Sequence, residues 1–147
     1  MIRLVSIDST NFKECLALKV GENQQSLVCS NSDSLARAYV YYDLAYPFAI
    51  YEEKVMVGFA LLRENPDDQS YFLWEYMIDE TYQGRGYGSQ ALEEIIEWVK
   101  TRDNVTKLMT TYKIGNEVAR HLYDKYGFKH FYTCEEEQEV DLILHLK

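Results

Sequence analysis

The chain has 147 residues, of which 47% are hydrophobic and 27% charged, and this is the size and balance of one globular domain. Its 24 acidic and 15 basic residues give a net charge of −9 without a basic stripe, which argues against proteins that bind nucleic acid or anionic membranes through positive charge. Three cysteines without a CxxC pair and three histidines without ligand spacing argue against a disulfide framework and a metal site.

The N-terminal stretch "MIRLVSIDST" does not have the pattern of a signal peptide, because it carries one basic residue and its apolar run is broken at Asp8. No stretch has the length of a membrane span. No repeat, low-complexity tract or linker divides the chain. We therefore expect a single cytoplasmic domain over residues 1–147, with no metal and with neither nucleic acid nor a membrane as partner.

The first half of the chain is predicted to form a strand, two helices and a hairpin. "IRLVSI" alternates as a short strand, and residues 10–20 and 33–44 have helical patterns, the second with Asp33 as a possible N-cap. "FAIYEE" and "KVMVGFALL" predict a hairpin closed by Glu53 and Lys54, and "NPDD" predicts a turn after it.

The second half alternates between strands and helices. Residues 71–79 form a strand that is too apolar on both sides for a sheet edge. A helical stripe follows from Ala91, then the strand "VTKLMTTY", then a helix that Asn116 caps and Gly127 ends, and finally two strands. The order βααβββαβαββ predicts an α/β fold in which a mixed sheet is packed between helices in three layers.

The stretch "QGRGYGS", from Gln83 to Ser89, places three alternating glycines where a strand gives way to a helix. Without Cβ atoms, successive backbone N–H groups can face a ligand, and the helix adds its unpaired N–H groups and the positive end of its dipole. This combination predicts a phosphate site. The alternative is a tight turn alone. The P-loop pattern is absent because no Gly-Lys-Ser/Thr follows, and the dinucleotide fingerprint fails at Ser89 and at the next strand, which ends in "TTY".

Two motifs carry a family resemblance. "QGRGYG" after "EYMIDETY" resembles the acetyl-CoA motif of the Gcn5-related N-acetyltransferase (GNAT) superfamily, and "NEVARHLYDKYGF" is similar to that superfamily's second motif. The segment "NQQSLVCSNSDSLARAYVYYDLAYPFAIY" also resembles the bacterial spermine/spermidine (diamine) acetyltransferase subgroup. The resemblance implies a GNAT-like acyl-CoA N-acyltransferase fold and an enzyme that uses acetyl-CoA as co-substrate.

The resemblance also implies roles for individual residues. The backbone from Arg85 to Ser89, with Gln83 at its start, is expected to hold the diphosphate. Met77 and Ile78 are expected to lie along the pantetheine arm, Asn116 to bond the arm near its reactive end, and Tyr123 to protonate the departing thiolate. The expected coenzyme-binding set is therefore Met77, Ile78, Gln83, Gly84, Arg85, Gly86, Tyr87, Gly88, Ser89, Asn116 and Tyr123.

The residues themselves leave some of these roles open. Tyr123 lies on the apolar stripe of its helix, so it could be a core residue, and Asn116 could be only an N-cap. Proton transfer from a tyrosine of pKa near 10 to a thiolate of pKa near 8.5 is roughly balanced. Glu75 is predicted to share a strand face with Leu73 and Met77, so a buried carboxylate could accept the amine proton, or it could simply form an ion pair.

The acceptor is expected to be a small cationic amine, most simply a polyamine such as spermidine or spermine, attacked in a ternary complex because no nucleophile constellation is present. Glu52, Glu53, Asp43 and the tyrosine-rich "AYVYYDLAY" suit a polycation, although they could be a solvated surface. The alternatives are another amine (an aminoglycoside, an amino acid or a protein N-terminus), a sensor that binds acetyl-CoA without turnover, and a scaffold that forms a dimer. A homodimer is also possible for the enzyme.

Overall fold

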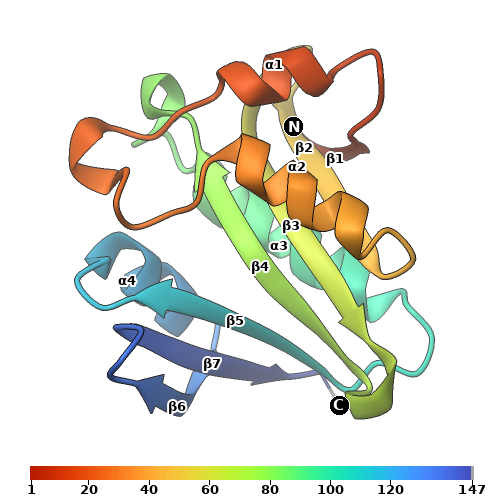
Figure 1. Cartoon of the computed structure of the whole chain (residues 1–147), viewed down its shortest axis with the longest axis vertical. Coiled ribbons are helices and arrows are strands. Elements are labelled where there is room, and N and C mark those ends of the chain that lie inside the picture. The colour runs from red at the N-terminus through yellow and green to blue at the C-terminus, as the bar shows by residue number, and fades with distance from the viewer. Residues whose placement is uncertain (147) are drawn as a thin grey trace.

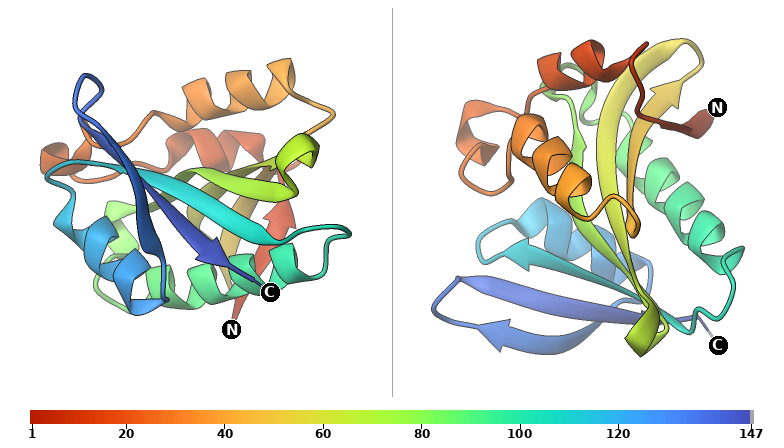
Figure 2. Two further views of the ribbon diagram at one scale, coloured as in Figure 1. Left: turned by 90° about the horizontal axis from the view of Figure 1, so that it is seen from below. Right: turned by 45° about the vertical axis from the view of Figure 1, so that its right-hand side comes forward.

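The computed structural model describes residues 1–146 and shows a seven-stranded sheet between two layers of helices (Figures 1 and 2). The sheet order is β1-β2-β3-β4-β5-β7-β6. The strands are β1 (Ile2–Ser6), β2 (Ala45–Glu52), β3 (Val55–Asn65), β4 (Ser70–Ile78), β5 (Lys107–Lys113), β6 (Lys129–Cys134) and β7 (Glu139–His145). The helices are α1 (Phe12–Ala17), α2 (Asn31–Val40), α3 (Tyr87–Lys100) and α4 (Glu117–Lys125). The predicted order βααβββαβαββ is confirmed.

Each face of the sheet has its own apolar core. Helices α3 and α4 cover one face, where Leu62 and Leu73 pack with Leu92 and Ile95 of α3. Helices α1 and α2 cover the other face, as the left view of Figure 2 shows. No helix within residues 1–146 is long and apolar enough to cross a membrane.

Helix α2 begins earlier than the sequence pattern predicted. Its N-cap is Ser30, whose side chain accepts a hydrogen bond of 3.1 Å from the backbone N–H of Asp33. Asp33 is therefore in the first turn, where its charge favours the positive end of the helix dipole, and its expected role as the cap was wrong. The caps of α4 were predicted correctly: Asn116 starts it, and Gly127 follows its end with a φ of 89°.

Strands β4 and β5 are paired at only one end. Their parallel register runs from Ser70 opposite Lys107 to Leu73 opposite Thr110 and then stops. Beyond this point the two strands diverge, as the green and cyan strands of Figure 1 show. A gap of this kind leaves backbone hydrogen-bonding groups of β4 without a partner strand, which is where the sequence motifs predicted the pantetheine arm.

A β-bulge in β4 changes which side chains share a face. Leu73 lies opposite Leu62, whereas Glu75 lies opposite Leu61, so Trp74 is an extra residue in the ladder. After the bulge, Glu75 and Met77 face α1 and α2, while Leu73 faces α3. The prediction that Glu75 shares a face with Leu73 was therefore wrong, because strict alternation does not survive a bulge; the shared face with Met77 is correct.

Candidate active site

The glycine loop and the start of α3 form one end of the site. Gly84 and Gly86 have φ values of 78° and 83°, which strain any other residue, and Gly86 is the N-cap of α3. The helix starts at Tyr87, inside the glycine stretch, so Gly88 belongs to its first turn. A Cβ atom at Gly88 would meet only ordinary contacts, the nearest being Ile78 Cγ1 at 3.8 Å, so the fold itself does not require glycine there.

The backbone N–H groups of this loop are open. Within residues 1–146, no N–H group from residue 84 to residue 89 donates a hydrogen bond of normal length and angle, although a weaker contact of the Arg85 N–H closes the turn at Gln83 and Gly84. The first N–H of α3 to donate such a bond is that of Gln90, to the carbonyl of Gly86 at 3.2 Å. Consecutive free donors at the positive end of a 14-residue helix favour an anion. These open donors are the feature on which the predicted phosphate site depends.

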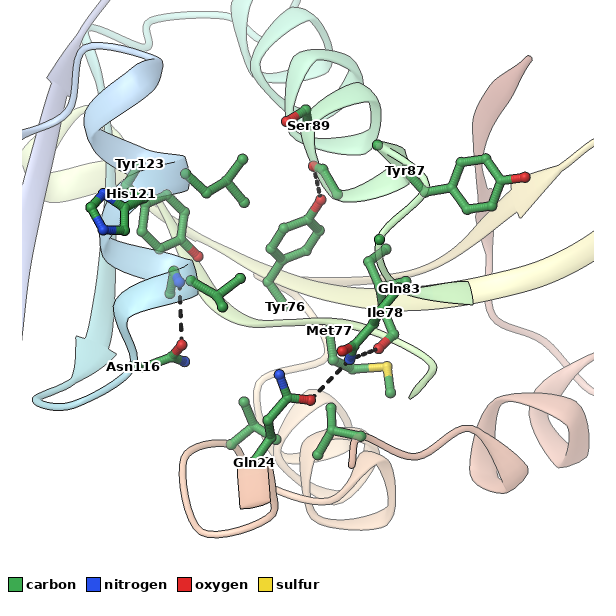
Figure 3. A pocket seen from close by; sticks show the side chains of 18 of the residues that line it. Gln24, Tyr76, Met77, Ile78, Gln83, Tyr87, Ser89, Asn116, His121 and Tyr123 are labelled. Atoms are coloured by element: carbon green, nitrogen blue, oxygen red, sulfur yellow. Dashed lines mark hydrogen bonds between the residues drawn. The ribbon is translucent and has the colours of Figure 1, made fainter. Parts of the chain in front are cut away.

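Side chains next to the loop tie it to the sheet (Figure 3). The Gln83 amide donates to the carbonyl of Ile78 at 2.9 Å and to Gln24 Oε1 at 3.0 Å, and the Tyr76 hydroxyl donates to the carbonyl of Gly88. The Arg85 side chain lies against the turn before the loop, with Nη2 3.5 Å from the carbonyl of Thr81 and the guanidinium 5.5 Å from the ring centroid of Tyr82.

A pocket of about 540 Å³ runs from this loop into the gap between β4 and β5. Its walls include side chains from both apolar cores, so it crosses the plane of the sheet. From the predicted set it is lined by Met77, Ile78, Gln83, Gly84, Gly86, Tyr87, Gly88, Ser89, Asn116 and Tyr123, whereas Arg85 and Glu75 do not line it.

The backbone of β4 faces the gap at alternate residues. The N–H of Asp79 donates to the carbonyl of Val57 in β3 at 2.8 Å, so the backbone groups of Ile78, and of Tyr76 two residues earlier, point to the opposite side. That side is the gap, because the pairing with β5 has already ended at Leu73. Ile78 presents its carbonyl to Gln83, which leaves the N–H groups as donors for a group in the gap.

Tyr123 lies in the wall of the pocket on α4, and its hydroxyl points into the pocket (Figure 3). The residue is only 4% exposed, and burial raises the pKa of its hydroxyl to about 12. The neighbouring Thr110 hydroxyl favours the anion and offsets a smaller part of this rise. The hydroxyl is thus a weaker acid than the sequence alone suggested.

Burial raises the pKa of a thiol as well as that of a tyrosine. At the ordinary thiol pKa of about 8.5, transfer of a proton from Tyr123 would be uphill by about 5 kcal/mol. However, burial also raises the pKa of the Cys15 thiol, on the buried face of α1, to about 11. A thiolate formed in the pocket beside Tyr123 would be destabilised in the same way, so the two acids again become similar in strength.

Glu75 lies on the α2 side of the sheet, close to the gap. Its side chain is 15% exposed, and Arg37 Nη1 lies 3.5 Å from its Oε1. Burial raises the pKa of Glu75, while contacts from Cys29 and then the charge of Arg37 act in the opposite direction. Glu75 therefore has both features that the sequence left open: it is a largely buried carboxylate, and it is in an ion pair.

The structure assigns Asn116 its capping role, because its Oδ1 accepts from the N–H of Ala119 at 3.2 Å. Its amide nitrogen donates to no group in the described residues, and the side chain also lines the pocket. Both interpretations of Asn116 are thus compatible with its position.

Sequence reasoning missed several residues of the site. Lys125 Nζ lies 3.4 Å from Ser89 Oγ, which brings a positive charge to the glycine loop. His121 lines the pocket from α4, and Val20, Gln24 and Val28 line it from the segment before α2. Lys125 stands in the second motif, but nothing in the sequence indicates that the end of α4 meets the start of α3.

Two of the acidic residues expected to bind a polycation already pair with another cation. Glu52 and Glu53 each accept a hydrogen bond of 2.9 Å from the N-terminal ammonium of Met1, so they are already paired.

Among residues 1–146, no group of three or more His, Cys, Asp or Glu side chains is arranged to hold a metal ion.

The sequence pattern of the acetyltransferase (GNAT) family matches residues 19–128, which include the glycine loop, the strand gap and α4. The chain belongs to this family. This GNAT protein is therefore an acetyl-CoA-dependent N-acetyltransferase, and the family and fold that its two motifs predicted are confirmed.

The GNAT protein is similar to named N-acetyltransferases over most of its length. It is 29% identical, over 136 residues, to the spermine/spermidine N(1)-acetyltransferase of Bacillus subtilis (strain 168), which covers 87% of this chain and 88% of that protein. Among solved structures, the spermidine N-acetyltransferase of Vibrio cholerae in complex with CoA and spermine has a TM-score of 0.81 at 18% identity, covering 98% of this chain and 95% of the other.

The same fold also occurs in enzymes with other acceptors. The ribosomal-protein-S18-alanine N-acetyltransferase of Escherichia coli has a TM-score of 0.76 at 19% identity, covering 100% of this chain and 95% of the other. The fold of the GNAT protein is thus shared with enzymes whose acceptors differ, and it does not by itself select the amine.

Proposed function

We propose that this enzyme transfers the acetyl group of acetyl-CoA to a primary amine of a small polycation, such as spermidine or spermine, by direct attack in a ternary complex. The observation that carries the proposal is the pocket that joins the open N–H groups of the glycine loop to the gap between β4 and β5. The similarity to the spermine/spermidine acetyltransferase of B. subtilis supports the class of acceptor.

The coenzyme would bind with its diphosphate on the backbone from residue 84 to residue 89, supplemented by the ammonium of Lys125. The pantetheine arm would then lie along Met77 and Ile78, within reach of the Asn116 amide. This orientation brings the thioester to the point where β4 and β5 separate, beside Tyr123.

In the reaction, the lone pair of the amine nitrogen attacks the thioester carbonyl carbon, and the carbonyl oxygen becomes an oxyanion. The N–H groups of β4 that face the gap would stabilise this oxyanion. When the carbon–sulfur bond breaks, the thiolate takes the proton of the Tyr123 hydroxyl. The acceptor loses two protons to Glu75 in turn, directly or through a water: one from the ammonium before attack, and one from the nitrogen after attack. Glu75 releases each proton to solvent, and solvent returns one proton to the Tyr123 phenolate, so the net products are the amide, the free thiol and one proton.

The acceptor must first lose its charge. A primary ammonium has a pKa near 10, so at about pH 7.5 its neutral form costs about 3 to 4 kcal/mol. Glu75 supports this step in two ways, because a buried carboxylate attracts the ammonium and its raised pKa makes it a better proton acceptor than an exposed one.

We also propose that residues 1–147 form one functional domain. A cytoplasmic location and a homodimer stay predictions.

A second positive charge on the acceptor would be attracted by the net charge of −9 and by the exposed acidic turn at Glu135 to Glu137.

The test is a thiol-release assay with acetyl-CoA and a panel of amines: spermidine, spermine, butylamine, an aminoglycoside, an amino acid and a peptide with a free N-terminus. We expect kcat/KM for spermidine to exceed that for butylamine at least about fivefold, because its further charges add attraction. Mass spectrometry of the product should place one acetyl group on a terminal nitrogen. Turnover of the peptide or the aminoglycoside without turnover of polyamines would refute the acceptor class. Binding of CoA with no thiol release for any amine would indicate a sensor.

A further inference from the structure

A cation already occupies the space beside Glu75. The guanidinium of Arg37, on α2, lies with Nη1 at 3.5 Å from Glu75 Oε1 and with Cζ at 5.3 Å from the ring centroid of Trp74. A carboxylate on one side and an indole face on the other are the two groups that bind an organic ammonium or guanidinium ion most effectively.

The bulge in β4 creates this arrangement. Because the register shifts between Leu73 and Glu75, the adjacent residues Trp74 and Glu75 both lie on the face that carries α2. In a regular strand, neighbouring residues point to opposite faces and could not bind one cation together. β-Bulges are frequent beside active sites, where they redirect a side chain.

Arg37 is held only weakly in this position. Its distance of 3.5 Å from the carboxylate is longer than that of a strong charge-assisted hydrogen bond, and its side chain is 39% exposed. The side chain is long, flexible and open to solvent, so it can leave without disturbing α2. Glu75, in contrast, is 15% exposed and fixed in a central strand, so the carboxylate remains when the arginine moves.

We propose that the Glu75–Trp74 site is the ammonium subsite of the acceptor and that Arg37 is its resident cation, which the acceptor must displace. This inference rests on the proposed function, in that it places the reacting amine beside Glu75. Arg37 is then a specificity-determining residue. It keeps the buried carboxylate paired while the site is empty, and it sets a minimum affinity that a weakly binding or neutral amine does not reach.

Removing the Arg37 side chain should tighten the binding of spermidine. We would titrate spermidine calorimetrically into the CoA complex of the wild type, Arg37→Gln and Arg63→Gln. Arg63 is the matched control, because its Cζ lies 4.8 Å from the same indole and the same charge is removed, yet it forms no ion pair within residues 1–146. Any general gain from a more negative surface appears in both variants.

For Arg37→Gln we expect the Kd of spermidine to fall about three- to fivefold, because the substitution removes a partly exposed ion pair that competes with the ligand. For Arg63→Gln we expect the Kd to change less than about twofold. A purely structural role for Arg37 would weaken binding or leave it unchanged. A Kd that is equal to or higher than that of the wild type, or one that falls equally in both variants, overturns the proposal.

A second measurement is independent of the acceptor, so it separates this inference from the polyamine assignment. In Arg37→Ala, guanidinium chloride at concentrations far below those that unfold the protein should refill the site and return the Trp74 fluorescence to that of the wild type. Sodium chloride is the control for ionic strength, and Trp74→Phe gives the contribution of Trp98. If spermidine is not acetylated but guanidinium restores the emission, the polyamine assignment fails and the cation site stands. No saturable response to guanidinium overturns the cation site.

Discussion

The Thr110 hydroxyl donates a hydrogen bond of 3.0 Å to the backbone carbonyl of Leu73, at the last position where β4 and β5 are paired. Thr110 is 1% exposed, and its side chain therefore closes the vertex from which the two strands separate. The pocket of about 540 Å³ begins beyond this bond, and Tyr123 approaches the same threonine from α4.

Replacing this residue tests whether the vertex depends on the hydroxyl. Thr110→Val keeps the shape of the side chain but leaves a buried carbonyl without its donor, so we expect a loss of about 1 to 3 kcal/mol in the free energy of unfolding, measured by denaturant titration. Thr111→Val is the control, because the Thr111 hydroxyl bonds the carbonyl of Val140 at 3.2 Å in a partly exposed position. Equal losses in the two variants would mean that the vertex has no special importance.

Tyr123→Phe removes the proposed proton donor, together with its contact to the Thr110 hydroxyl, and keeps the aromatic ring. A general acid typically accelerates a reaction at least about 100-fold. We expect kcat to fall by about this smallest factor, because a hydroxyl with a pKa of about 12 is a weak acid. The Kd of CoA, measured by calorimetry, should stay within about twofold of the wild type, since the phenylalanine ring keeps the pocket wall that Tyr123 forms. Unchanged kcat, with thiol release still the measured step, would remove Tyr123 from the mechanism.

The ionised Glu75 side chain should lower the free energy of unfolding at neutral pH while it supports catalysis. The pKa of Glu75 is raised in the folded protein, so the folded state favours the protonated carboxyl. The protonated carboxyl therefore stabilises the fold at low pH, and this stabilisation is lost as the pH rises through the folded-state pKa. Glu75→Gln should therefore have a Tm at about pH 7.5 that equals or exceeds that of the wild type, and the difference should shrink as the pH falls toward about 4.

The same substitution should lower kcat/KM and remove the part of its pH dependence that reports ionisation of the carboxylate. Asp141→Asn, another partly buried acid on β7, is the control for a general loss of negative charge. A Glu75→Gln enzyme that is less stable but fully active would show that Glu75 is only the structural partner of Arg37.

Lys125 should contribute to coenzyme binding through its charge. Lys125→Gln is expected to raise KM for acetyl-CoA about fivefold at low ionic strength, and the difference should diminish in high salt because the charge is exposed. Lys129→Gln, at the exposed start of β6, removes the same charge away from the pocket and should have little effect. Equal effects of both variants would contradict a local contact.

The sequence was sufficient for the order of the elements, because the helical stripe from Ala91, the alternation of the strands and the caps at Asn116 and Gly127 are local signals. The phosphate site at the glycine loop stays a prediction from the alternating glycines before a helix. The start of α3 was harder to locate, because Gly88 has low helix propensity and yet lies in its first turn.

Other features depend on tertiary structure. The bulge at Trp74 has no distinctive sequence pattern, so the face of Glu75 relative to Leu73 could not be derived. The approach of Lys125 to Ser89 depends on how α4 packs beside α3, and the pairing of Glu52 and Glu53 with Met1 depends on the position of β1 at the sheet edge. Each of these contacts joins segments that are far apart in the chain.

Calorimetric titration of CoA into the wild type and Gly88→Leu tests most directly whether the bare backbone of the glycine loop holds the coenzyme. A Cβ atom at this helical position meets only Ile78 Cγ1 at 3.8 Å and the Tyr76 hydroxyl at 4.0 Å, and leucine favours a helix over glycine, so we expect the variant to fold. The rest of the leucine side chain would occupy pocket space beside Ile78 and Tyr76, so we predict a Kd for CoA that is at least about tenfold higher. Glu94→Ala, on the exposed face of α3, controls for altered helix stability. An undiminished affinity in a fully folded Gly88→Leu protein would contradict the account.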